Sequence, residues 1–208
     1  MKAILFGATG KTGIEICKEL ERQSIPFTSF VRTGSEKKLP NKETSFINGD
    51  VMNPTEVKKA IFSDLFTDVI VALGSKDLKG SGIRTIGTQN IIDSIHEKGK
   101  YSKLHVISAL GVRESWKQLK WHMKLLAKLF IGSTMKDHHT QETAVVQSGL
   151  DYHILRPVEL KDGDAQGNVH VQNEGFLPSS VIQRADVAQY LVNSMIEGKQ
   201  GVSGICNN

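Results

Sequence analysis

The sequence predicts an α/β fold in which helices cover both faces of a single doubly wound parallel sheet. Short apolar runs alternate with amphipathic stretches along the 208 residues. The chain also opens with an apolar run, regularly spaced glycines and a helical pattern, and turn residues stand where elements should end. Strand–helix–strand units in series form parallel sheets, which bind ligands at the carboxyl ends of their strands.

Apolar runs mark the strands, and stretches with helical periodicity separate them. The expected strands are Lys2–Phe6, Phe27–Val31, Ser45–Asn48, Val69–Leu73, Leu104–Ser108 and His153–Leu155. The expected helices are Ile14–Gln23, Thr55–Phe62, Arg84–Lys98 and Lys136–Ser148. Pro54 begins the second helix and Gly99 follows the third, as is typical of helix ends. A helix at Arg184–Glu197 and a short strand at Val202–Cys206 should pack on the same sheet, so we expect residues 1–208 to form one domain.

The first strand runs into the segment Gly-Ala-Thr-Gly-Lys-Thr-Gly, at positions 7–13. Such glycines permit a tight turn, close approach of the backbone to a pyrophosphate, and close packing of helix on strand. The helix that follows offers free amides and the positive end of its dipole. An ATP-binding P-loop is excluded, because it requires a glycine where Leu5 stands. The segment therefore predicts an NAD(P)-binding Rossmann fold. The expected contacts here are Gly7, Thr9, Gly10, Lys11, Thr12 and Gly13.

The residue after the second strand indicates which coenzyme binds. Arg32 stands nineteen positions after Gly13. Sites that prefer NAD usually have a carboxylate there, which accepts from the ribose 2′-hydroxyl and would repel a 2′-phosphate. A guanidinium instead binds a 2′-phosphate through charge-assisted hydrogen bonds. Arg32 therefore predicts NADP(H), although an arginine that merely follows a strand in solvent is the alternative.

Two further strand ends lie on the same edge of the predicted sheet. Asp50 and Val51 follow the third strand, where the carboxylate is placed to accept from an adenine amino group. Ala72, Leu73 and Gly74 end the fourth, where small residues let the backbone approach the coenzyme. The alternative is that Asp50 caps the next turn and Gly74 merely permits one.

Composition limits the remaining possibilities. The net charge of +4 suits anionic ligands without requiring nucleic acid, and no groove-reading motif accompanies the basic residues. Cys17 and Cys206 have no metal-ligand spacing, so we expect no metal and a reducing, cytoplasmic location. Neither a signal peptide nor an apolar run of about 20 residues is recognisable.

A series of motifs occurs in a characteristic order along the chain. They are Gly-Ala-Thr-Gly-Lys-Thr-Gly, Gly49-Asp50-Val51, Ala72-Leu73-Gly74, Ile107-Ser108-Ala109, Ser148-Gly149-Leu150-Asp151-Tyr152, Leu155-Arg156-Pro157 and Arg184-Ala185-Asp186-Val187-Ala188. In this the chain resembles the atypical short-chain dehydrogenase/reductase group of NAD(P)H-binding proteins. It is most similar to the flavin reductase (biliverdin reductase B) branch, with NmrA-like sensors as more distant relatives.

The usual catalytic pair of short-chain dehydrogenases, Tyr-x-x-x-Lys, is absent. The residues four positions after the three tyrosines are His105, Arg156 and Ser194. The resemblance instead implies that His138, in a His-x-x-x-Glu pattern with Glu142, lies next to the acceptor. A second histidine of the branch is missing, since the matching stretch is Arg156-Pro157-Val158-Glu159, so that side of the acceptor pocket should differ.

Ser108 and His138 are the expected catalytic residues. Ser108 should touch the acceptor or the nicotinamide, and Pro157 completes the expected coenzyme contacts. An ordinary histidine pKa of about 6.5 would suit His138 as a proton donor. The alternatives are a serine that caps backbone and a histidine that is only solvated.

The segment Trp116–Ile131 combines lysines at helical spacing with many apolar residues. A helix packed on the core with a solvated lysine stripe, an apolar lid over the acceptor, and a helix lying on a membrane surface all fit this pattern.

These observations predict an NADPH-dependent reductase that transfers hydride to a flavin-like or quinone-like small molecule. Flavin is already electrophilic at its ring nitrogen, so its reduction needs little acid catalysis. A catalytically silent NADP(H) sensor fits the missing tyrosine–lysine pair equally. Nucleotide-sugar isomerase or epimerase chemistry fits less well, because it normally uses that tyrosine.

Overall fold

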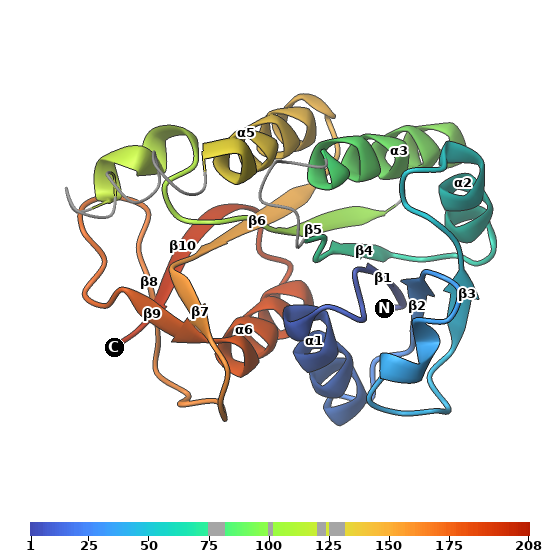
Figure 1. The fold of residues 1–208 in the computed structure, drawn as a ribbon, viewed down its shortest axis with the longest axis horizontal. Coiled ribbons are helices and arrows are strands. Elements are labelled where there is room, and N and C mark those ends of the chain that lie inside the picture. Colours follow the sequence, from blue (N-terminus) through green and yellow to red (C-terminus); the bar gives the residue numbers. More distant parts are fainter. Residues whose placement is uncertain (75–81, 100–101, 120–123, 125–131) are drawn as a thin grey trace.

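The computed structural model describes residues 1–74, 82–99, 102–119, 124 and 132–208. Its main sheet has the order β3-β2-β1-β4-β5-β6-β10-β8. The strands are β1 Ala3–Phe6, β2 Phe27–Val31, β3 Phe46–Asn48, β4 Asp68–Val71, β5 Lys103–Ile107, β6 Tyr152–Pro157, β8 Val169–Val171 and β10 Gly201–Asn207. Within this sheet all neighbours are parallel except β8, which runs antiparallel to β10 at one edge. The predicted doubly wound parallel sheet is confirmed (Figure 1).

Helices cover both faces of this sheet, as Figure 1 shows. On one face lie α1 Lys11–Arg22 and α6 Arg184–Glu197, which contact each other. On the other lie α2 Pro54–Phe62, α3 Ile83–Lys98 and α5 Gly132–Gln147. Short 3-10 helices are η1 Glu36–Lys38 and η2 Arg113–Gln118.

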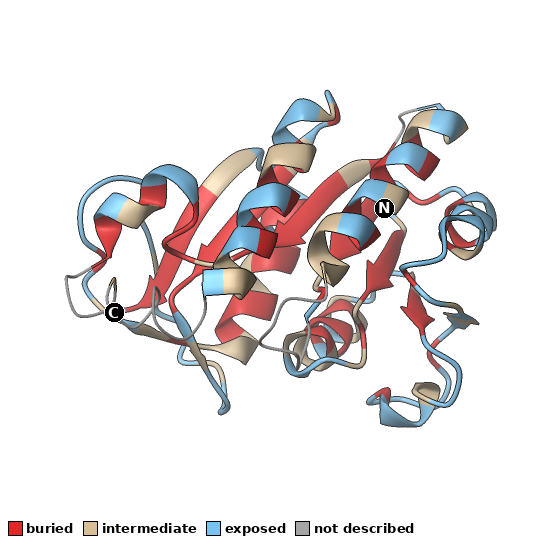
Figure 2. Ribbon diagram, turned by 45° about the horizontal axis from the view of Figure 1, so that its top comes forward, coloured by how far each residue is buried: buried red, intermediate tan, exposed pale blue. Residues whose placement is uncertain are grey.

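The sheet separates two apolar cores, because successive strand side chains point to opposite faces. In β1, Ala3 and Leu5 belong to the core beneath α1 and α6, whereas Ile4 and Phe6 belong to the core beneath α2, α3 and α5. All four are fully buried. Figure 2 shows the central strands as buried on both sides, with the exposed residues on the outer faces of the helices.

Local sequence explains the helix ends. Asn53 caps α2, accepting from the amides of Thr55 and Glu56, and Pro54 occupies the first turn. The carboxylate of Glu56 in turn accepts a hydrogen bond from the side-chain amide of Asn53, with 3.0 Å between Nδ2 and Oε1. The expected start of α1 at Ile14 is wrong: the helix begins at Lys11, because Gly10 serves as its N-cap.

Three short strands of the structure were not predicted from the sequence. They are β8, β7 Glu159–Lys161 and β9 Val181–Gln183, of which the last two form a separate parallel pair. Three-residue strands are too short to show a period of two, and each of these contains at least one polar side chain. The pair lies at the β6–α6 side of the fold (Figure 1).

Within the described residues, no helix has the length and apolar character needed to cross a bilayer. The alternatives considered for Trp116–Ile131 lie largely outside the described part of the chain, which includes only residues 116–119 and 124 of that segment.

Candidate functional site

The turn between β1 and α1 is packed as tightly as the glycine spacing predicts. Gly7 has φ +91°, and a Cβ added there would lie 2.4 Å from the carbonyl oxygen of Ala72 at the end of β4. A Cβ added to Gly13 would lie 2.1 Å from the carbonyl oxygen of Gly7. Gly10 is exposed, and no side chain caps the helix at this residue. Among the residues that the structure describes, no side chain caps the first amides of α1, which lie beside an exposed backbone, as a bound phosphate requires.

The other predicted contacts of this turn lie in the same place, with one complication at Lys11. Thr9 and Thr12 are half-buried on either side of Gly10. The ammonium of Lys11 pairs with Asp162 at 2.5 Å, and Asp162 also accepts from Arg184. Both Lys11 and Asp162 are mostly exposed, so the pair is weak, and a phosphate ligand would compete with the carboxylate for Lys11.

Strands β3 and β4 end at the same edge of the sheet as the glycine turn. It is mainly their backbones, and not their side chains, that are available to a ligand there. Val51 and Leu73 are buried and pack against Gly87 of α3, so their side chains are core residues and only their main chain can contact a ligand. The carboxylate of Asp50 accepts from the amide of Met52 at 2.9 Å. The turn-capping alternative for Asp50 is therefore observed, and contact with adenine stays a prediction.

Arg32 follows β2 on this edge with its side chain exposed. No ion pair joins its guanidinium to any residue within the described ranges. A surface guanidinium that has no carboxylate partner remains available to an anion. This placement is compatible with the predicted role, since Arg32 and the glycine turn lie at the carboxyl ends of adjacent parallel strands.

Ser108 and His138 come together from different elements. Ser108 follows β5 and is held by its amide, which donates to the carbonyl of Leu155 at 2.7 Å. His138 lies on α5, and its Nδ1 is 3.5 Å from the Oγ of Ser108, a long contact between two buried side chains. Pro157 ends the neighbouring strand β6, and its carbonyl accepts from Leu110 at 2.9 Å. The structure thus brings together the two residues predicted to be catalytic.

The expectation of an ordinary pKa for His138 is wrong. Burial, together with the nearby positive charge of Arg84, lowers the pKa of His138 to about 3. Its imidazole is therefore neutral at pH 7, and the imidazolium form that could act as a general acid is not populated. It can accept from or donate to Ser108, depending on its tautomer.

Asp137, which sequence reasoning missed, clamps α5 to the start of α3. Its carboxylate accepts from the amide and the hydroxyl of Thr85, at 3.0 and 2.7 Å, and from the amide of Arg84 at 3.3 Å. Burial alone would raise the pKa of Asp137, but these hydrogen bonds outweigh it and lower that pKa. Asp137 thus caps α3 from another helix and fixes the helix segment that carries His138. No local motif signals a cap supplied from 52 residues away.

A buried ion cluster lies next to this pair. The guanidinium of Arg156 makes two hydrogen bonds to Glu142 of α5, at 3.0 and 2.7 Å, and one to Glu114 of η2 at 2.7 Å. The Glu142 side chain is fully buried and that of Arg156 is 5% exposed. A cavity of about 530 Å³ opens beside Arg156, between η2, β10 and the loop at residues 173–175. The cluster ties β6 to α5 one helical turn from His138.

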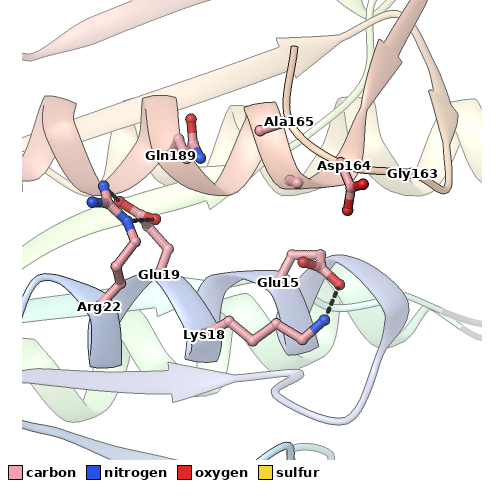
Figure 3. A pocket seen from close by; sticks show the side chains of 9 residues that line it. Glu15, Lys18, Glu19, Arg22, Gly163, Asp164, Ala165 and Gln189 are labelled. Carbon is pink, nitrogen blue, oxygen red and sulfur yellow. Dashed lines mark hydrogen bonds and ion pairs between the residues drawn. The ribbon is translucent and has the colours of Figure 1, made fainter. Parts of the chain in front are cut away.

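A second cavity, of about 400 Å³, lies between α1, α6 and the loop at residues 163–165. Figure 3 shows two ion pairs at this cavity, Lys18 with Glu15 and Arg22 with Glu19. None of the predicted site residues lines it. This groove is therefore separate from the residues that the sequence predicts to form the site.

Comparison with known proteins agrees with this geometry. The model of the NAD(P)H-binding family matches residues 7–197. A chloroplastic protein of Arabidopsis thaliana, itself uncharacterized, is 27% identical over 205 residues, which are 94% of this chain and 72% of that protein.

Solved structures share the whole fold. The anaerobilin reductase ChuY of Escherichia coli superposes with a TM-score of 0.81 at 24% identity, covering 100% of this chain and 97% of that one. A short-chain dehydrogenase/reductase of Veillonella parvula in complex with NADP gives 0.81 at 15% identity, covering 99% and 94%. A Streptococcus pneumoniae protein provisionally described as an NADH-flavin reductase gives 0.76 at 18% identity, covering 100% of both chains. At these identities the likeness establishes a common fold.

Proposed function

The chain belongs to the NAD(P)H-binding family, and from this premise we propose that it is an NADPH-dependent reductase of a flavin-like or quinone-like small molecule. The observation that carries the proposal is the meeting of Ser108 and His138 on the sheet edge that also carries the glycine turn. Proteins of the same fold include an anaerobilin reductase and a protein provisionally described as an NADH-flavin reductase. Both names support the proposal that the acceptor is a conjugated ring compound.

The residues of this edge fit a nicotinamide coenzyme. Gly7 and Gly13 leave no room for a Cβ, and no side chain of the described residues caps the amides of α1 beside Gly10. When bound, NADPH supplies a hydride, and the two electrons pass to the acceptor while a proton comes from water. The protein binds the diphosphate at the glycine turn and orients the nicotinamide toward the edge formed by Ser108 and Pro157. Such positioning is most of what a hydride transfer to an electrophilic ring needs.

Ser108 and His138 are proposed to hold the acceptor rather than to protonate it. The Ser108 hydroxyl can donate to a carbonyl or ring nitrogen of the acceptor while the neutral His138 accepts from Ser108. Because the pKa of His138 is lowered to about 3, this pair should not produce an acid limb near pH 6.5 in the rate profile. The proton on the reduced acceptor then comes through solvent.

Replacing Arg32 by alanine should weaken NADPH binding on the order of tenfold to a hundredfold, because about 1.5–3 kcal/mol of charge-assisted hydrogen bonding to the 2′-phosphate is lost. NADH lacks that phosphate, so its dissociation constant should be nearly unchanged in the same variant. Calorimetric titration of both coenzymes measures the two constants. Equal NADPH affinity in Arg32→Ala and the parent protein would refute the assignment.

Replacing Ser108 by alanine should lower kcat for FMN reduction on the order of tenfold, the usual scale for one neutral hydrogen bond of about 1–1.5 kcal/mol. NADPH affinity should stay close to that of the parent. Loss of NADPH absorbance at saturating FMN measures kcat, and the exposed Ser63→Ala serves as the matched control. A parental rate in Ser108→Ala would remove this serine from the mechanism.

A silent NADP(H) sensor is the second candidate, and two observations favour it. The chain lacks Tyr-x-x-x-Lys, and His138 cannot act as a cationic acid at neutral pH. The two functions separate in one assay, in which NADPH is mixed with FMN, menadione or biliverdin. Turnover of any acceptor supports the reductase, whereas tight coenzyme binding without turnover across the panel supports the sensor.

A further inference from the structure

Arg84, at the start of α3, carries a buried positive charge that the described protein groups leave poorly satisfied. Its side chain is 12% exposed. The Nε–H is buried and finds no hydrogen-bond acceptor among the described residues. A guanidinium has five N–H donors, and leaving such donors unpaired in the interior is costly.

The nearest carboxylate compensates Arg84 only in part. Nη1 of Arg84 lies 3.5 Å from Asp137, longer than a good charge-assisted hydrogen bond. The oxygens of Asp137 are already occupied by the amide and hydroxyl of Thr85 and by the Arg84 amide itself. Burial accordingly lowers the pKa of Arg84, against the opposing effect of Asp137. Asp137 therefore uses most of its hydrogen-bonding capacity to cap α3, and little of it to neutralise the guanidinium of Arg84.

The guanidinium borders the proposed coenzyme site. Gly74, the exposed residue beyond β4, would place an added Cβ 3.8 Å from Nη2 of Arg84, the one contact within 4 Å of that point among the residues that the structure describes. Arg84 is also close enough to His138 to lower the pKa of that imidazole. Arg84 is therefore near Gly74, at the end of β4 that the glycine turn contacts, and near His138 of the Ser108–His138 pair.

We propose that Arg84 binds an oxyanion of a ligand at the carboxyl edge of β4, a phosphate or carboxylate that enters over Gly74. The inference rests on the proposed coenzyme site and extends it by one residue. The oxyanion comes either from the coenzyme diphosphate or from an anionic group on the acceptor. Both supply the acceptor atoms that the buried guanidinium lacks.

Two arms of one experiment, done with the whole 208-residue chain, separate these sources. Calorimetry gives the dissociation constant of NADP⁺, and steady-state rates give KM for FMN and for riboflavin, which differ by a phosphate. In Arg84→Gln, a rise on the order of tenfold in the NADP⁺ constant assigns the coenzyme diphosphate. A similar rise in KM for FMN alone, with riboflavin unchanged, assigns the acceptor. Arg22→Gln, at the far end of α1, is the control and should match the parent in both arms.

A measurement on the unmutated chain guards against misfolding of the variant. The buried Nε–H of Arg84 should give its own nitrogen–proton NMR signal, assigned by its loss in Arg84→Lys, and NADP⁺ or FMN should shift it. Parental constants in Arg84→Gln together with an unmoved signal would overturn the proposal. Absence of NADP⁺ binding by the parent would instead refute the proposed function, so the two failures are distinguishable.

Discussion

Replacing Gly13 by alanine should abolish measurable coenzyme binding and lower the free energy of unfolding by about 3 kcal/mol. The added Cβ would meet the Gly7 carbonyl oxygen at 2.1 Å and the Ala8 Cα at 2.9 Å, both backbone atoms that cannot rotate away. Either α1 shifts or the turn opens, and both movements displace the amides that bind phosphate. Calorimetry with NADP⁺ and urea denaturation measure the two effects.

Gly132→Ala is the matched control for this change. Position 132 lies in the first turn of α5, where an added Cβ meets no atom of the described part of the chain within 4 Å. Alanine is favoured over glycine in a helix by up to about 1 kcal/mol, so this variant should be as stable as the parent or more so and should bind coenzyme normally. If Gly13→Ala behaved like Gly132→Ala, the tight turn would not be what binds the coenzyme.

Replacing Arg156 by methionine should destabilise the protein by about 3–5 kcal/mol, because it leaves a charge buried without a partner. Glu142 is fully buried and would lose both of its hydrogen bonds to the guanidinium. Glu114, 64% exposed, can return to water and should contribute little. Urea denaturation at pH 7 measures the loss.

The double variant Arg156→Met/Glu142→Leu tests the cause of that loss. It removes the stranded carboxylate together with its partner, and buried ion pairs replaced by apolar residues often recover their stability. We therefore expect at least half of the lost free energy to return. A double variant no more stable than Arg156→Met would show that packing, and not the unpaired Glu142, causes the loss.

Much of the fold could be predicted, because its main elements carry strong local signals. Strand β1 is a continuous apolar run and β2, β3 and β4 are mostly apolar, while Asn53-Pro54 and Gly99 mark helix ends through their own conformational preferences. The edge strand β8 and the β7–β9 pair could not be predicted in this way. Their partners are far along the chain, and their pairing depends on where β10 and β6 have already placed the backbone.

The site could be predicted where a single segment of the chain forms it. It could not be predicted where residues from two segments act on each other. The glycine turn acts through its own backbone, so its spacing was sufficient. The Ser108–His138 pair was suggested by family resemblance and lies together in the structure. The lowered pKa of His138 depends on burial and on Arg84, which comes from another helix, so no reading of residues near position 138 could have supplied it.

The clamp made by Asp137 has a consequence for how the molecule assembles. The first turn of α3 obtains its cap from a residue more than fifty positions later in the chain, after β5 has been made. Contacts over such separations form late, since the intervening chain must first be ordered. We therefore expect the ligand-binding edge to be completed near the end of folding, when the two halves of the sheet have joined. Ligand should consequently favour the fully assembled chain over partly folded forms, in which this edge is incomplete.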